Sequence, residues 1–345
     1  MAFAAVTSEL VPETLSEYGA ITRAALKDYL PSQEPRRHLY DLITDYPHRG
    51  GKMMRPSICI ATARVFGAPV TDAIRSAVSI ELLHNALLIH DDIEDESLQR
   101  RGRPALHHQH GIALSINAGD TLALMSLRPL IDNESWLGPR LAMRILEDTE
   151  HMARETAEGQ AMELGWRRDN TIDLGDADYL KMVLKKTCWL GVIYPCRVGA
   201  IIGSKDSVDL EPFVRFGFFL GAAFQIQDDL LNLHADERYG KEADGDIWEA
   251  KRTLMLIRLL QRASPLELER LGRILGATRE TRTAGQVRWI RELYDTYDCI
   301  DHARKTAHAL AGAAVHECAR ALHHLPPTRD KSFLEGLATW VFERT

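Results

Sequence analysis

Cysteine is scarce in this sequence, with only five residues among 345, and no two of them have C-x-x-C spacing. Structural zinc sites and disulfide frameworks need paired or clustered cysteines, so neither is predicted. The scarcity is typical of a reducing compartment, and we expect a cytoplasmic protein. The N-terminal segment also lacks the basic and apolar regions of a secretory signal.

Long uninterrupted hydrophobic runs are missing as well. The two most apolar stretches, residues 188–203 and 213–227, contain Arg197 and Arg215 respectively. Neither reaches the roughly 20 apolar residues of a membrane-spanning helix, so no span is predicted. A basic excess is also missing, because 42 Lys and Arg stand against 49 Asp and Glu for a net charge of −7. This balance argues against a nucleic-acid partner.

The sequence shows no clear alternating pattern of the kind that predicts strands. Apolar residues recur instead with a helical period, as in Ile74, Ala77, Val78 and Leu82. Thr71 or Asp72 is predicted to cap the helix that leads to residue 95. The fold class expected from this pattern is all-α, a single large helix bundle of about a dozen helices.

No Pro-, Gly- or Ser-rich linker divides the chain, so residues 1–345 are predicted to form one domain. Within it, residues 1–35 are expected to form an N-terminal helical arm. Residues 50–252 contain the motifs described below, and residues 266–345 are expected to close the bundle.

Two acidic clusters each follow an apolar helical segment. The first is Asp91-Asp92-Ile93-Glu94-Asp95 and the second is Asp228-Asp229-Leu230-Leu231-Asn232. On a helix, residues four apart share a face, so Asp91 lies beside Asp95. Carboxylates on one face repel each other unless a cation lies between them, and oxygen ligands suit Mg²⁺. The pair of clusters therefore predicts metal sites at the mouth of a cavity.

Basic residues are interleaved with these acidic clusters in the sequence. They occur in Gly50-Gly51-Lys52 with Arg55, in Arg100-Arg101-Gly102-Arg103, at Lys185-Lys186, at Gly240-Lys241 and at Lys251-Arg252. Mg²⁺ bridges carboxylates to phosphate, and Lys or Arg neutralises the remaining phosphate oxygens. The combination indicates a diphosphate substrate.

With these motifs together, the chain resembles the trans-type isoprenyl diphosphate synthases. The string Leu83-His84-Asn85-Ala86-Leu87-Leu88-Ile89-His90-Asp91-Asp92-Ile93-Glu94-Asp95 is similar to the family's first aspartate-rich motif, and Phe224-Gln225-Ile226-Gln227-Asp228-Asp229 is similar to the second. Gly159-Gln160 and Lys186-Thr187 match in family order. The resemblance is strongest to geranylgeranyl diphosphate synthases. It implies a fold of the isoprenoid synthase type, with helices around a central apolar cavity.

The resemblance also implies a role for each matching residue. Catalytic residues would be Asp91, Asp92, Asp95, Lys186, Asp228 and Asp229. Of these, Asp91, Asp95 and Asp228 would ligate about three Mg²⁺ ions. The allylic diphosphate would be held by Arg100, Lys186, Thr187, Gln225, Lys241 and Lys251. Isopentenyl diphosphate would be held by Lys52, Arg55, His84 and Arg101. Asn232 replaces an aspartate of the commoner second motif and predicts weaker metal binding there.

Product length is expected to depend on residues below the first acidic cluster. One helical turn is about 5.4 Å, similar to one isoprene unit. Ala86 and Leu87 lie one turn from Asp91, and Ala123 with Leu124 follow on the next helix. Their small or moderate side chains predict a pocket open to at least twenty carbons, whereas Trp189 would narrow it. We interpret the product as geranylgeranyl diphosphate.

Two other functions fit part of the pattern. A class I terpene cyclase also uses an aspartate-rich motif and Mg²⁺, but it needs no isopentenyl diphosphate site. A non-catalytic subunit that regulates a prenyl synthase would be expected to lose one acidic motif, and both are present. The resemblance further implies a homodimer.

Overall fold

Seventeen α-helices form most of the computed structural model, which describes residues 2–234 and 243–342. Twelve of these helices have eleven or more residues, which confirms the prediction of an all-α bundle with about a dozen helices. The α-helices are α1 Ala2–Leu26, α2 Asp41–His48, α3 Met54–Val65, α4 Val70–Glu94, α5 Leu106–His110, α6 Ile112–Met125, α7 Leu127–Leu137, α8 Pro139–Arg168, α9 Asp176–Val183, α10 Tyr194–Ser204, α11 Glu211–Asn232, α12 Gly245–Trp248, α13 Leu254–Arg262, α14 Pro265–Leu275, α15 Ala284–Thr296, α16 Cys299–Leu322 and α17 Arg329–Phe342.

Four shorter helical segments and one small hairpin complete the described secondary structure. The 3₁₀-helices are η1 Lys27–Tyr29 and η4 Arg279–Thr281, and the π-helices are η2 Arg36–Tyr40 and η3 Leu184–Ile193. Strands β1 Gln99–Arg100 and β2 Arg103–Pro104 pair antiparallel. No strand was predicted here, because two-residue strands are too short to show alternation.

Several helix starts follow directly from local sequence. Ser264 caps α14 and Glu267 bonds back to the Ser264 N–H, with Pro265 in the first turn. The start of α4 differs from the prediction, because the helix begins at Val70 and neither Thr71 nor Asp72 caps it. Asp72 instead accepts a hydrogen bond of 2.9 Å from the indole of Trp136.

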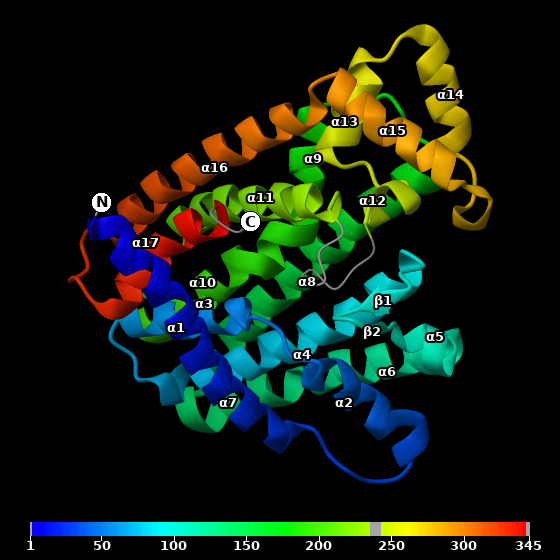
Figure 1. Ribbon diagram of the computed structural model, residues 1–345. Coiled ribbons are helices and arrows are strands. Elements are labelled where there is room, and N and C mark those ends of the chain that lie inside the picture. The colour runs from blue at the N-terminus through cyan, green and yellow to red at the C-terminus, as the bar shows by residue number, and fades with distance from the viewer. Residues whose placement is uncertain (1, 235–242, 343–345) are drawn as a thin grey trace.

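Two cores hold the bundle together. The larger lies among α3, η3, α10, α11 and α16, and the smaller lies between α2, α4 and α6. In Figure 1, α16 runs along α11, while α13, α14 and α15 project at one end of the molecule. All five cysteines are buried free thiols. Within the described ranges, no helix has both the length and the apolar character that crossing a membrane requires.

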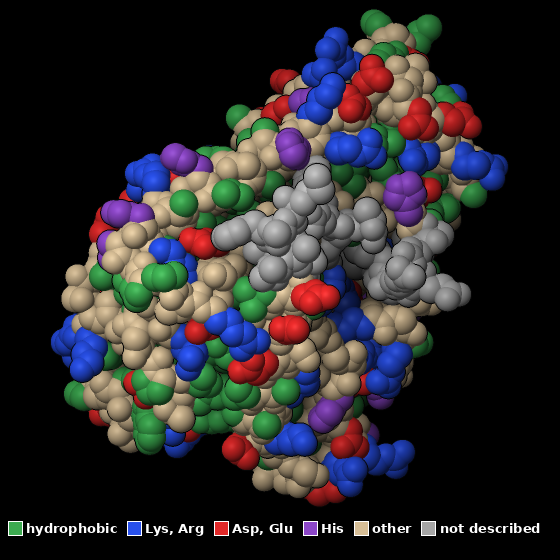
Figure 2. Space-filling view, turned by 60° about the vertical axis from the view of Figure 1, so that its left-hand side comes forward, with side chains coloured by type: hydrophobic (Ala, Val, Ile, Leu, Met, Phe, Trp, Pro, Cys, Tyr) green, Lys and Arg blue, Asp and Glu red, His purple; other side chains and the backbone are tan. Residues whose placement is uncertain are grey.

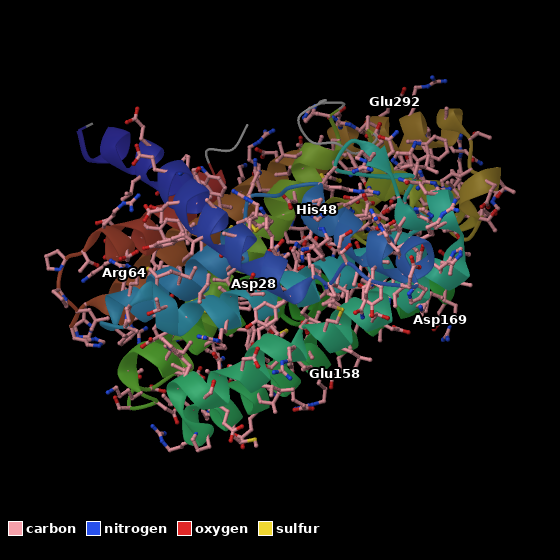
Figure 3. All side chains as sticks on the ribbon, turned by 90° about the horizontal axis from the view of Figure 1, so that it is seen from below. Asp28, His48, Arg64, Glu158, Asp169 and Glu292 are labelled. Carbon is pink, nitrogen blue, oxygen red and sulfur yellow. The ribbon has the colours of Figure 1, made fainter. Side chains whose placement is uncertain are left out.

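The N-terminal helix is tied to the C-terminal helix by a buried carboxylate. The Tyr18 hydroxyl on α1 donates to Asp330 on α17, and the Arg64 guanidinium on α3 donates to the other Asp330 oxygen at 2.9 Å. Figure 3 shows Arg64 where these three helices meet. Helices from both ends of the chain therefore close the same end of the bundle.

Candidate active site

A cavity of about 730 Å³ lies between α4, α8, η3 and α11. Its polar end contains carboxylates and cations from both acidic clusters and from the hairpin. The apolar and small residues that line the cavity are Leu83, Leu87, Leu88, Ala153, Ala157, Leu164, Met182, Val183, Leu190 and Phe224. Figure 2 shows Lys and Arg side chains deep in a hollow, with acidic side chains near its rim. The cavity thus suits a ligand with a charged head and an apolar tail.

The aspartates of the first acidic cluster point in different directions. Asp91 lines the cavity and lies 3.3 Å from Lys186 Nζ. Asp95 follows the last residue of α4 and is buried, with its two oxygens 2.5 Å from Arg167 Nη1 and 2.6 Å from Lys251 Nζ. Burial alone would raise the pKa of Asp95, but Lys251 and Arg167 hold it below its usual value. Asp95 is therefore an ion-paired carboxylate behind the cavity wall.

Asp92 anchors the hairpin instead of facing the cavity. It is fully buried, and the Arg100 Nε–H donates to its oxygens at 2.9 and 3.1 Å. The Tyr46 hydroxyl donates to the same carboxylate at 2.5 Å. Burial alone would lower the pKa of Arg100, but Asp92 and Asp91 outweigh it and raise that pKa.

The hairpin turn explains why the basic run points inward. Arg101 and Gly102 both have positive φ, of 54° and 71°, as a type I′ turn requires. This turn pairs Arg100 with Arg103, so Arg100 and Arg101 reach the cavity wall while Arg103 stays on the surface.

The second acidic cluster is held by neutral hydrogen-bond donors. Asp228 lines the cavity from α11. The carboxylate of its neighbour Asp229 accepts from the Tyr179 hydroxyl and from the Gln225 amide, each at 2.8 Å, and Thr187 donates to Gln225 at 2.8 Å. Burial raises the pKa of Asp229 to about 6 against the opposing effect of these bonds. This network connects α9, α11 and η3 around the cavity.

Asn232 supports the cavity wall through a backbone contact. Its side chain is buried, and its Oδ1 accepts a hydrogen bond of 2.9 Å from the backbone N–H of Asp246. Asp246 lines the cavity, close to Lys251. Weaker metal binding at Asn232 stays a prediction.

Lys186 and Thr187 lie on η3, a π-helix, and π-helical turns occur frequently at functional sites. Lys186 Nζ contacts both Glu163 on α8 and Asp91 on α4. Gly159 of α8 makes this approach possible, because a Cβ there would lie 2.2 Å from the Lys186 backbone nitrogen. The sequence motif Gly159-Gln160 thus allows close packing of α8 against η3.

Replacing Gly159 by alanine is expected to destabilise the protein by about 1–3 kcal/mol, the usual range for an overpacked core. It should also reduce turnover, because η3 and Lys186 must shift. Thermal unfolding and steady-state kinetics measure the two effects. Gly165→Ala in the same helix is the control, because a Cβ there meets nothing within 4 Å. It should stabilise the helix by up to about 1 kcal/mol. Equal stability and equal turnover of Gly159→Ala and Gly165→Ala would contradict the role of Gly159 in packing α8 against η3.

A second group of cations lines the cavity beside α3. Arg55 Nη1 lies 3.3 Å from His84 Nε2, and Arg101 is part of the same wall. Burial, and then the charges of Arg55 and Arg101, hold the pKa of His84 well below its usual value. Burial raises the pKa of Glu81, which lies near both arginines. These residues form a cationic recess with a neutral imidazole.

Two predicted diphosphate ligands are not placed in the cavity wall. Lys52 is exposed, and its Nζ lies 5.7 Å from the ring centroid of Trp340 on α17. It is not among the residues that line the cavity. Lys241 lies outside the described residues.

Only one of the five predicted product-length residues lines the cavity, and that residue is Leu87. Ala86 and Ala123 face the smaller core between α4 and α6, and Leu124 is 69% exposed on the outer side of α6. Trp189 is buried against His151, away from the lining residues. The expectation for these four residues is corrected, because helical spacing does not say which neighbour a face meets.

Several residues of the site had no predicted role. Tyr179, Glu163 and Asp246 line the cavity, as does Arg252 of the basic pair Lys251-Arg252, and Arg167 pairs with Asp95 behind it. Glu163 had a usable signal, because it stands four residues after Gly159 and so lies on the same helix face. Tyr179 had none, because a tyrosine on an apolar helix is usually ordinary core.

Comparisons with known proteins agree with this arrangement. The family model described as Polyprenyl synthetase matches residues 36–294. A short chain isoprenyl diphosphate synthase of Methanothermobacter thermautotrophicus is 33% identical over 86% of this chain and 87% of its own length. A geranylfarnesyl diphosphate synthase of Natronomonas pharaonis is 29% identical over 98% of this chain and 99% of its own. The crystal structure of a geranylgeranyl pyrophosphate synthetase of Pyrococcus horikoshii superposes with a TM-score of 0.85 at 30% identity, covering 98% of this chain and 99% of that chain.

Proposed function

Since this chain belongs to the polyprenyl synthetase family, we propose that it joins isopentenyl diphosphate head to tail to an allylic diphosphate and yields mainly geranylgeranyl diphosphate. The family places it among prenyltransferases that elongate isoprenyl diphosphates. One observation supports the assignment most strongly. A single cavity contains carboxylates from both acidic clusters, two groups of cations and an apolar end.

The residues at the polar end fit Mg²⁺. Asp91 on α4 and Asp228 on α11 both line the cavity, with Asp246 beside them. Among the described residues, no three acidic, His or Cys side chains gather closely enough to hold a metal alone. This suits Mg²⁺, which is commonly held by one or two carboxylates together with substrate phosphates. When bound, Mg²⁺ stabilises the negative charge that develops on the leaving diphosphate.

The allylic diphosphate is held at the same end. Lys186, Arg100 and Lys251 provide positive charge, and Thr187 with Gln225 provide hydrogen bonds. All five line the cavity and are fixed by neighbouring side chains, so they need little rearrangement when the C1–O bond breaks and charge develops on oxygen. The cationic recess of Arg55, His84 and Arg101 holds isopentenyl diphosphate.

The apolar end has two functions in this reaction. It excludes water, which would otherwise add to the allylic cation and yield an alcohol. It also orients the cation so that the double bond of isopentenyl diphosphate attacks C1, and a proton then leaves to the released diphosphate. Leu87 and Phe224 provide its upper wall from opposite helices.

The direct test is an assay of the purified chain with Mg²⁺, isopentenyl diphosphate and each allylic starter in turn, with product length measured by mass spectrometry. A dominant twenty-carbon diphosphate is the expected result. A different dominant length would overturn the product but not the elongation. A hydrocarbon from one starter alone would favour a terpene cyclase. No product with any starter would favour a non-catalytic subunit.

We also propose that the chain acts as a homodimer through the outer faces of α6, α7 and α8. These faces expose large apolar side chains, at Ile112, Ile116, Leu124, Leu127, Ile131, Met143 and Leu146. Contiguous exposed apolar surface of this kind is typical of an interface, and the family resemblance makes a second copy the expected occupant.

Leu124→Arg should convert the dimer to a monomer, because it introduces a charge into this face. Light scattering after gel filtration measures the mass. Leu266→Arg is the control, since Leu266 is 80% exposed on α14, outside this face. A wild-type chain that runs as a monomer, or a Leu124→Arg chain that stays dimeric, would contradict the interface.

A further inference from the structure

The cavity lining ends at a definite residue on each of three helices. On α4 the last lining residue is Leu83, on α8 it is Ala153 and on η3 it is Leu190. Beyond these residues, Ile80 and Ile145 are completely buried in the larger core. The cavity therefore ends against packed side chains, and the residues that cross from one helix to another at that point form its floor.

A pair of polar side chains crosses the bundle at this floor. The Tyr194 hydroxyl, at the start of α10, lies 2.6 Å from Thr149 Oγ1 on α8. Thr149 is one helical turn from Ala153, and Tyr194 is about one turn from Leu190. Tyr194 is 1% exposed and Thr149 is 5% exposed. The tyrosine ring is thus fixed at one edge by a buried hydrogen bond, about one helical turn beyond the last lining residues of α8 and η3.

The surroundings keep Tyr194 from moving aside. Thr149 donates to the Ile145 carbonyl at 2.7 Å, so its second hydrogen bond fixes its rotamer. One residue away, Asp148 accepts from Arg197 Nε at 3.1 and 3.0 Å, which joins α8 to α10 a second time. Helix α10 also packs against α3 and α4. A growing chain would have to break these contacts to pass the ring.

We propose that Tyr194 is the residue that ends chain growth, a conclusion that rests on the proposed elongation activity. Gln160 lies at the mouth, where it bonds Glu94, and Ala153 is the last residue of α8 that lines the cavity. A growing chain that passes Ala153 would meet the Tyr194 ring about one helical turn further on. The ring would therefore set the longest allylic diphosphate that the cavity accepts.

Tyr194→Ala is the test, with product length by mass spectrometry as the readout. The variant should shift the dominant product to at least one isoprene unit longer than that of the wild-type protein measured in parallel. Tyr194→Phe retains the ring and should leave product length unchanged, which separates ring volume from the hydrogen bond. Trp189→Ala is the second control, because Trp189 packs against His151 outside the cavity lining and should not change product length.

Ala153→Phe tests the same floor without emptying the core. An aromatic ring one turn above Tyr194 should shorten the dominant product by one isoprene unit or more. This variant keeps the proposal testable if Tyr194→Ala does not fold, which circular dichroism will show. Folded Tyr194→Ala with unchanged product length would overturn the proposal, as would Ala153→Phe with unchanged product length. A wild-type chain that elongates nothing would overturn the proposed function instead, so the two failures are distinguishable.

Discussion

Replacing Arg100 by methionine is expected to lower the free energy of unfolding by about 3–5 kcal/mol, the cost of leaving a buried carboxylate without its cation. Asp92 is fully buried, and Arg100 makes hydrogen bonds to both of its oxygens. The Tyr46 hydroxyl, 2.5 Å away, would remain as a hydrogen-bond donor to that carboxylate. Urea unfolding measures the loss. Turnover should fall as well, because Arg100 also lies 3.3 Å from Asp91 in the cavity.

Two further variants separate the stability effect from the catalytic one. Arg103→Met removes a cation from the same hairpin, but its 3.2 Å contact with Asp45 is at the surface and should contribute no more than about 1 kcal/mol. Arg100→Met combined with Asp92→Asn removes the unpaired charge and should recover much of the lost stability without recovering turnover. If Arg100→Met lost no more stability than Arg103→Met, the ion pair of Arg100 with buried Asp92 would not stabilise the fold as proposed.

The sequence was sufficient to predict the fold class and which chain segments meet at the cavity. Helical periodicity and the two acidic clusters, each after an apolar segment, required that Asp91 and Asp228 face a common space. Their side chains do line one cavity. Lys186 and Thr187, by contrast, were assigned through the resemblance to the family, and both line the same cavity. Charge pattern predicted the acidic residues of the site, and the resemblance supplied the roles of this pair.

The direction of individual side chains was not predictable in the same way. Asp92 and Asp95 belong to the same motif as Asp91, yet both are buried in ion pairs with Arg100 and Arg167. Arg100 stands 8 residues after Asp92 and Arg167 stands 72 residues after Asp95, and no local pattern shows which carboxylate either arginine contacts. Ala86 faces α6 for a similar reason, because a helix with apolar residues on most of its surface contacts several neighbours. Tertiary packing alone decides which face meets the cavity.

Replacing Asp228 by asparagine is expected to reduce turnover by about 10²–10³-fold, the range seen when one group that stabilises developing charge is removed. Asp91→Asn should have a similar effect, because the two carboxylates line the cavity from opposite helices. Asp72→Asn is the control, since Asp72 lies at the far end of α4 and bonds the Trp136 indole. It should keep full turnover. Steady-state kinetics with saturating Mg²⁺ and both diphosphates measure these effects.

A second readout shows whether the two aspartates act through Mg²⁺ or only through the shape of the site. Titration calorimetry with inorganic diphosphate, at several Mg²⁺ concentrations, measures how strongly metal and diphosphate bind together. Asp228→Asn should weaken binding when Mg²⁺ is present and should strengthen or preserve it when Mg²⁺ is absent, because one negative charge is removed from the wall of a cavity that would bind an anion. A purely structural role would weaken binding in both conditions. Since asparagine has nearly the same volume as aspartate, the opposite signs follow from charge alone, and equal losses would overturn the assignment of Asp228 as a metal ligand.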